Sequence, residues 1–122
     1  MAKVLIVDDE ESIRGFVKQV VEMQGHEAKE AENGRIAADL YENFQADLVI
    51  TDLIMPEMDG LELIVHVKKK YPSVKIIAMS GRAALDTRHY LEFANRFGAN
   101  KILEKPVDMD TLINTIAEVL AA

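Results

Sequence analysis

Polar residues stand at four points where an apolar segment of the sequence ends. These residues are Asp8-Asp9-Glu10, Asp52, Ser80 and Glu104-Lys105-Pro106. Buried parallel strands are apolar throughout, so the polar residues that end them are informative. In an open parallel sheet all carboxyl ends lie on one edge, where ligands bind. The sequence therefore predicts that four distant stretches form one pocket.

Three carboxylates, those of Asp8, Asp9 and Asp52, would share this pocket. Like charges at close range raise one another's pKa unless a cation lies among them. Mg²⁺ prefers carboxylate, water and phosphate oxygens, and Asp residues without His or Cys nearby suit it better than zinc. Lys105 would add a positive charge and Ser80 a hydroxyl donor, which indicates a site for a phosphoryl group. A carboxylate beside the metal can itself be the nucleophile and become an aspartyl phosphate.

Each of these residues also has a purely structural interpretation. Asp8-Asp9-Glu10 could be acids at a helix N-terminus, where they complement the helix dipole. Taken singly, Asp52 could be a loop residue, Ser80 part of a turn and Lys105 a solvated charge. Their joint occurrence favours the functional interpretation, although charge clusters in a cleft can also be structural.

The elements that would position these residues follow from the hydrophobic pattern. Short apolar segments alternate with longer segments of helical spacing, which is typical of βα units around a parallel sheet. The segment 27–31 has low β propensity and is assigned by its place in the alternation, so we expect it to be an edge strand. The predicted strands are 3–7, 27–31, 48–51, 74–79 and 101–103.

Five helices are predicted in the remaining segments. The first ends near Gly25, and a fourth carries Leu91, Ala94 and Phe97. The other three begin after Asn33, Asp59 and Asp108, which are good capping residues. In the second helix we expect Ile36, Leu40 and Phe44 to form the apolar stripe.

Length and composition fit one globular domain over residues 1–122. Hydrophobic residues make up 49% and charged residues 29% of the chain, unlike a disordered chain. The longest apolar runs are far below the ~20 residues of a membrane span. The amino terminus lacks the features of a signal peptide, so we expect a cytoplasmic protein. The net charge of −7 disfavours direct nucleic-acid binding, which depends on Lys and Arg.

The chain resembles the response-regulator receiver family of two-component signalling over residues 3–120. The matching segments are 4–10 (VLIVDDE), 52–60 (DLIMPEMDG), 78–81 (AMSG) and 105–106 (KP). Four such segments in one order are far more specific than any one alone. The resemblance implies a doubly wound, flavodoxin-like α/β domain with a five-stranded parallel sheet in the order 2-1-3-4-5 and five helices.

The resemblance also assigns roles to individual residues. Asp52 would be the phosphoacceptor. Asp9, Asp52 and the backbone carbonyl of Ile54 would bind Mg²⁺ directly, and Asp8 would assist through water. Ser80 would be the hydroxyl switch that moves to hydrogen-bond the phosphoryl group. In the family, a lysine like Lys105 forms a salt bridge in the site, and the bond to the next residue, here Pro106, is often cis.

Departures from the family pattern affect the switch and the phosphoryl lifetime. Ile102 stands where the family often has an aromatic rotamer switch, so the signal would pass mainly through the loop after Ser80 and the following helix. Ile54 and Arg82 lie two positions after Asp52 and Ser80, where the family tunes the lifetime. We expect both side chains to hinder the attacking water and to make the phosphoryl group long-lived.

The leading hypothesis is a signalling switch rather than a turnover enzyme. Asp52 would take a phosphoryl group from a sensor histidine kinase or phosphotransfer protein and hydrolyse it slowly. The change would alter the fourth helix, fifth strand and fifth helix, and with them the binding of a downstream effector or output domain. For the oligomeric state, the sequence allows either a monomer or a dimer that forms on phosphorylation.

Three alternatives remain. A phosphorylation-independent interaction module of the same fold has only Ile102 in its support. A flavodoxin-like cofactor binder is disfavoured by the acidic loop after the first strand, where flavin phosphate needs amides and hydroxyls. A haloacid-dehalogenase-type phosphatase needs a second Asp two residues after the first, where this chain has Glu10.

Overall fold

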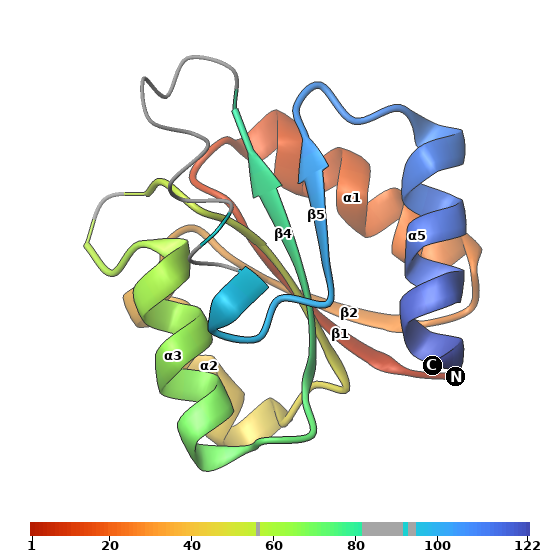
Figure 1. The fold of residues 1–122 in the computed structure, drawn as a ribbon. Helices are drawn as coiled ribbons and strands as arrows, with labels where there is room; N and C mark the ends of the chain where they lie inside the picture. The colour runs from red at the N-terminus through yellow and green to blue at the C-terminus, as the bar shows by residue number, and fades with distance from the viewer. Residues whose placement is uncertain (56, 82–91, 93–94) are drawn as a thin grey trace.

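A single parallel β-sheet forms the centre of the molecule (Figure 1). The computed structural model describes residues 1–55, 57–81, 92 and 95–122. The strand order is β2-β1-β3-β4-β5, which confirms the predicted order and places β2 at an edge. The strands are β1 (Lys3–Val7), β2 (Glu27–Ala31), β3 (Leu48–Asp52), β4 (Lys75–Ser80) and β5 (Lys101–Glu104).

Four helices are described over their full length. They are α1 (Glu11–Met23), α2 (Gly34–Phe44), α3 (Gly60–Lys70) and α5 (Met109–Ala121). The predicted fourth helix falls largely on Leu91 and its neighbours, which lie outside the described residues; the described Glu92, Asn95 and Arg96 are helical. Among the described residues, no helix has both the length and the apolar character needed to cross a bilayer.

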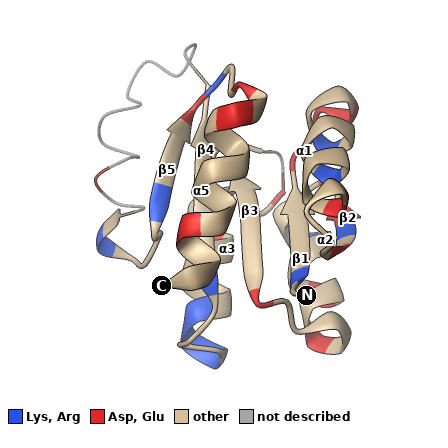
Figure 2. Ribbon diagram, turned by 90° about the vertical axis from the view of Figure 1, so that its right-hand side faces the viewer, with Lys and Arg blue, Asp and Glu red and all other residues tan. Residues whose placement is uncertain are grey.

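The three predicted capping residues begin their helices. The side chains of Asn33, Asp59 and Asp108 accept hydrogen bonds from backbone amides three residues ahead, at 2.9, 2.9 and 2.7 Å. The bonds to Thr111 also lower the pKa of Asp108. At the other end of α3, Lys68–Lys70 make the last turn basic (Figure 2), and cations at this end complement the helix dipole.

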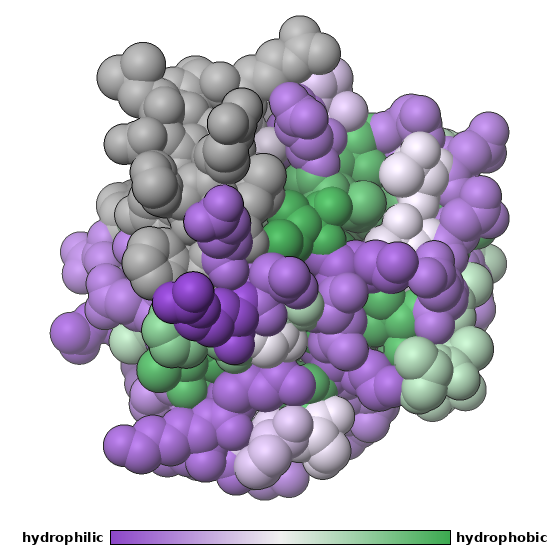
Figure 3. All heavy atoms as spheres, viewed as in Figure 1, coloured by the Kyte–Doolittle hydropathy of each residue, from purple (hydrophilic) through white to green (hydrophobic). Residues whose placement is uncertain are grey.

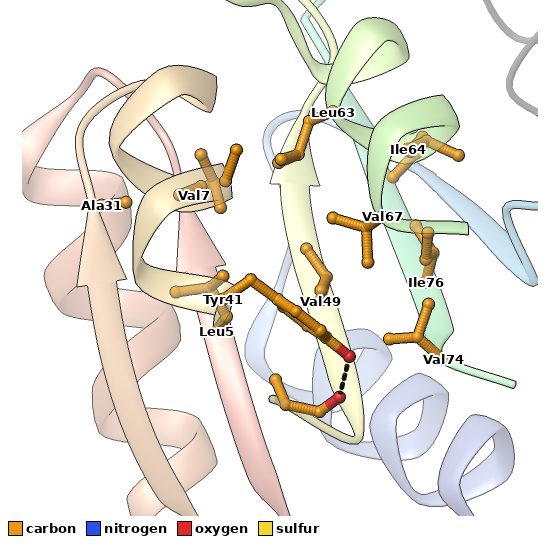
Figure 4. Packing of buried hydrophobic residues seen from close by; sticks show 14 of the residues in the cluster. Leu5, Val7, Ala31, Tyr41, Val49, Leu63, Ile64, Val67, Val74 and Ile76 are labelled. Carbon is orange, nitrogen blue, oxygen red and sulfur yellow. Dashed lines mark hydrogen bonds between the residues drawn. The ribbon is translucent and has the colours of Figure 1, made fainter. Parts of the chain in front are cut away.

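Helices cover both faces of the sheet, because successive strand residues point to opposite sides. In β1, Val4 and Ile6 pack with α1 and α5, whereas Leu5 and Val7 pack with α2 and α3. Much of the surface in the view of Figure 3 is hydrophilic, and the apolar side chains between α2, α3 and the sheet are drawn in Figure 4. Each of these helices therefore packs on one of two cores, and the central strands contribute to both.

The apolar face of α2 differs from the prediction. Phe44 is buried and Leu40 packs half-buried against the core, as predicted, but Ile36 is 38% exposed, and Ala37, Ala38 and Tyr41 complete the buried face. The reason lies at its first residue, where the Gly34 amide donates to the Met58 carbonyl at 3.0 Å. A Cβ on Gly34 would lie 2.1 Å from that oxygen, so this close approach fixes which side of α2 meets the sheet.

Candidate functional site

The carboxyl ends of the strands lie level with one another at one edge of the sheet. Thr51 in β3 pairs with Val7 in β1, so the residues that follow, Asp52 and Asp8, are neighbours. Ser80, the last residue of β4, pairs with Glu104 in β5, and Lys105 follows directly. The parallel register thus brings the predicted stretches to one place.

Lys105 joins two of the predicted carboxylates. Its Nζ lies 2.7 Å from Asp8 Oδ2 and 3.2 Å from Asp52 Oδ2. Asp8 is fully buried and Asp52 is 6% exposed, so water screens these contacts little. A longer contact of 3.6 Å reaches Glu10 Oε1. The structure therefore brings the ends of β1, β3 and β5 together around one cation.

Burial and neighbouring charges shift the pKa values of this cluster. Burial raises the pKa of Asp52, the Lys105 charge opposes that rise, and the Asp8 charge adds to it; the net direction is upward. For Lys105, burial lowers the pKa, but the hydrogen bond to Asp8 and the charge of Asp52 outweigh it. Lys105 therefore stays protonated, and an ionised Asp52 is held at a free-energy cost that a further cation would reduce.

Asp8, Asp9 and Glu10 form an acidic group at the end of β1. One carboxylate oxygen from each lies within 4.8 Å of the others. Asp8 already accepts hydrogen bonds from the Glu10 amide and from Lys105. Asp9 is exposed, and its carboxylate has no hydrogen bond or ion pair with any described residue. This hard, oxygen-only donor set fits Mg²⁺, with Asp9 more available than Asp8 for direct binding.

Ser80 is 2% exposed, and its hydroxyl has no hydrogen-bond partner within the described part of the chain. A buried polar atom without a partner is costly. The backbone of Ser80 is fixed, because its carbonyl accepts from the Lys105 amide at 2.7 Å. The Ser80 hydroxyl is therefore an unsatisfied donor on the residue whose backbone is bonded to Lys105.

The remaining predicted residues are placed as follows. Ile54 is 47% exposed, and its backbone forms a hydrogen bond with Asp52 that lowers the carboxyl pKa. Ile102 is partly buried and packs against the core on the α2 and α3 side. The peptide bond between Lys105 and Pro106 is cis. Arg82 lies outside the described residues.

The sequence left two contributions to the site without a role. Glu10 was placed in the pocket by its position after two aspartates, and the structure adds that it reaches Lys105 and belongs to the acidic group. Gly60 begins α3 against the backbone of Asp52, where a Cβ would lie 2.0 Å from the Asp52 carbonyl oxygen. Its predicted role was only to open a helix, since a contact between chain segments has no local signature.

Known proteins are similar to this chain in sequence and in fold. Residues 4–117 match the family described as the response regulator receiver domain. The chemotaxis protein CheY of Listeria monocytogenes is 36% identical over 117 residues, which cover 95% of this chain and 96% of that protein. The DNA-binding transcriptional regulator NtrC of Azospirillum brasilense is 35% identical over 119 residues, 98% of this chain but 24% of that protein.

Solved structures show the same similarity. A CheY-like response regulator receiver domain protein from Methanospirillum hungatei has a TM-score of 0.91 and 31% identity, and covers 99% of this chain and 94% of its own. Relatives of the chain also include sensor kinases, of which it matches a small part. The chain therefore belongs to the response regulator receiver domain family.

Proposed function

We propose that this receiver domain is a switch that accepts a phosphoryl group on Asp52 from a sensor histidine kinase or phosphotransfer protein. The observation that carries the proposal is the contact of Lys105 Nζ with both Asp8 and Asp52, at 2.7 and 3.2 Å. It places a fixed positive charge beside a buried carboxylate. Phosphoryl transfer needs positioning and charge neutralisation of this kind more than covalent assistance.

In the proposed reaction, an Asp52 oxygen attacks the phosphorus of a phosphohistidine. A P–O bond forms on Asp52 and the P–N bond breaks, so that the electron pair returns to the imidazole. A bound Mg²⁺ would neutralise phosphoryl oxygens, and Asp9, Asp52 and the carbonyl of Ile54 would hold it, with Asp8 assisting through water. The site residues then return to their resting contacts when the acyl phosphate hydrolyses slowly.

Ser80 and Lys105 can link this reaction to the rest of the domain. The unsatisfied Ser80 hydroxyl can donate to a phosphoryl oxygen, and Lys105 can shift from Asp52 towards the same group. Their backbones are joined by the 2.7 Å hydrogen bond from the Lys105 amide to the Ser80 carbonyl. Movement at the site would therefore reach β4 and β5 together, the proposed route to the output surface.

The output surface in this proposal includes β5 and α5. Figure 3 shows hydrophobic surface over β5 and the adjoining side of α5, and Leu103, Val107 and Ile113 of this region are partly buried. Such a surface suits a protein partner whose binding changes with phosphorylation. The partner in this proposal is a downstream effector or output domain, and the receiver acts as a monomer or as a phosphorylation-dependent dimer. The proposal also includes slow self-hydrolysis of the phosphoryl group, with a rate tuned by Ile54 and Arg82. A cytoplasmic location also belongs to it and rests on the sequence alone.

The proposal is tested by intact mass after incubation with Mg²⁺ and acetyl phosphate. We expect one phosphoryl adduct on the wild-type chain, and none on Asp52→Asn or without Mg²⁺. Asp47→Asn, at the opposite edge of the sheet, is the matched control and should keep the adduct. A wild-type chain without any adduct would favour the phosphorylation-independent interaction module.

A further inference from the structure

Arg14 makes a contact with the acidic loop that the proposed reaction does not use. Its Nη1 donates to the backbone carbonyl oxygen of Asp8 at 2.8 Å. The Arg14 side chain is only 16% exposed, so water competes weakly for this bond. The carbonyl belongs to the peptide group between Asp8 and Asp9. Because that group is planar, a fixed carbonyl also fixes the direction in which the chain enters Asp9.

The contact completes the restraint of Asp8. The amide of Asp8 donates to Ala31 at 3.2 Å, Oδ1 accepts from the Glu10 amide at 2.9 Å, and Oδ2 accepts from Lys105 at 2.7 Å. Arg14 engages the remaining polar atom. Asp9 has no such side-chain contacts among the described residues, so its carboxylate depends on this backbone for its position.

Glu30 holds the guanidinium from the other side. Its Oε1 lies 3.4 Å from Arg14 Nε, and its Oε2 lies 3.4 Å from Lys18 Nζ. Glu30 belongs to β2 and pairs with Ile6 of β1. Arg14 therefore bridges the edge strand and the acidic loop with two different nitrogens. A lysine ammonium cannot reproduce this fixed fork.

We infer that Arg14 is a positioning residue for the metal and phosphoryl site, which orients the Asp8–Asp9 peptide so that the carboxylate of Asp9 is ready to bind a divalent cation. The inference rests on the proposed function, because it explains part of the affinity of the same site for Mg²⁺. Residues that orient metal ligands typically change metal affinity by about 10–100-fold when they are replaced.

Lys18 provides a matched control. It lies on the same helix, carries the same charge and contacts the same Glu30, but it makes no hydrogen bond or ion pair with Asp8. We would titrate Mg²⁺ into wild type, Arg14→Met and Lys18→Met and follow the backbone amide shifts of Asp9 and Glu10 by NMR. Arg14→Met should bind Mg²⁺ about 10-fold more weakly, and Lys18→Met should stay within about twofold of wild type because exposed ion pairs contribute little.

The phosphorylation rate gives a second measurement. With acetyl phosphate, Arg14→Met should be slow at limiting Mg²⁺ and approach the wild-type rate at saturating Mg²⁺, because the reacting groups are intact. Thermal unfolding without Mg²⁺ checks the fold of each variant. If Arg14→Met does not fold, Arg14→Lys takes its place and should show the same weaker binding, since it keeps the charge and loses the fork.

The outcomes separate this inference from the proposed function. A wild-type chain that neither binds Mg²⁺ nor becomes phosphorylated would overturn both. A phosphorylated wild type with unchanged Mg²⁺ affinity in the Arg14 variant would overturn only the inference. Equal losses in the Arg14 and Lys18 variants would also overturn it, because they would show a general charge effect rather than positioning.

Discussion

The two edges of the β-sheet differ in how their polar groups are paired. At the carboxyl edge, Asp8 and Asp52 are buried around the partly buried Lys105, and the Ser80 hydroxyl has no partner among the described residues. At the amino edge, the hydroxyl of Tyr41 donates to the Ala46 carbonyl at 2.5 Å (Figure 4). The proposed site thus lies at the edge where buried charges are close together and a buried hydroxyl has no partner in the part of the chain that the structure describes.

The difference is not one of shape. The amino edge has a hollow of about 640 Å³ lined by Tyr41, Asp47, Tyr71 and Lys75 among others, and this is larger than the space a metal ion needs. Yet its backbone groups are paired: the Lys3 amide donates to Asp47 Oδ2 at 2.8 Å, and the Lys75 amide donates to the Asp47 carbonyl at 3.0 Å. Among the described residues that line this hollow, no buried side-chain polar atom lacks a hydrogen-bond partner, in contrast to the Ser80 hydroxyl.

The largest expected effect is that of Lys105→Met at the carboxyl edge. The variant leaves the Asp8 and Asp52 carboxylates without their shared cation, and a broken buried ion pair costs about 3–5 kcal/mol. Urea unfolding without Mg²⁺ should show a loss of this order. Mg²⁺ should restore more stability to the variant than it adds to wild type. A loss as small as that of an exposed ion pair would contradict the account of this edge.

Tyr41→Phe should have a smaller effect, at the amino edge. The change leaves the buried Ala46 carbonyl without a donor, which costs about 1–2 kcal/mol, and should not alter phosphorylation. Tyr71→Phe is the control, because its hydroxyl makes only a 3.4 Å contact with an exposed Glu42. Slower phosphorylation of Tyr41→Phe would show that the two edges are coupled.

Tyr41 also predicts a dependence on alkaline pH. Burial, with smaller contributions from Tyr71 and Asp47, raises its pKa from 10.0 to about 12. The folded state thus holds the phenol proton more tightly than the unfolded state, so this stabilisation is complete below pH 10 and is lost as the pH rises towards about 12. The free energy of unfolding, measured from about pH 10 to about pH 12, should fall less steeply with pH for Tyr41→Phe than for wild type. Equal slopes for the two proteins would contradict the assignment of this pH dependence to Tyr41.

The smallest expected effect on stability is that of Ser80→Ala. Its buried hydroxyl makes no hydrogen bond with the described residues, so its removal should not lower the free energy of unfolding and should raise it by about 1 kcal/mol, because an unpaired buried polar group is costly. Thr115→Ala is the control and should cost more, because the Thr115 hydroxyl donates to the Thr111 carbonyl at 2.7 Å. Phosphorylation of Ser80→Ala should shift the NMR signals of β5 and α5 less than in wild type. A large loss of stability would indicate a resting partner for this hydroxyl.

The sequence predicts most of the fold because burial in this domain follows local periods. The bounds of β1 and β2 match the predicted segments 3–7 and 27–31, and Asn33, Asp59 and Asp108 begin their helices as predicted. The sheet edge that gathers the polar residues follows from parallel strands alone. These features are set by residues close in sequence, or by a rule common to all such sheets.

Features that depend on contacts between segments could not be predicted in this way. Ile36 looks like a core residue by its spacing, but the close approach of Gly34 to Met58 turns it outwards. The reach of Lys105 to Asp8 as well as Asp52 depends on register and side-chain length. The hydrogen bond from Arg14 to the Asp8 carbonyl could not be predicted from the sequence, because arginine is common on the exposed faces of helices.

Chemical trapping of the phosphorylated residue tests the central claim most directly. Borohydride reduces an acyl phosphate to an alcohol, so the labelled aspartate becomes homoserine and peptide mass mapping identifies its position. After treatment with Mg²⁺ and acetyl phosphate, we predict homoserine at position 52 and nowhere else. Homoserine at position 8, 9 or 47, or at none, would contradict the assignment of Asp52 as the phosphoacceptor.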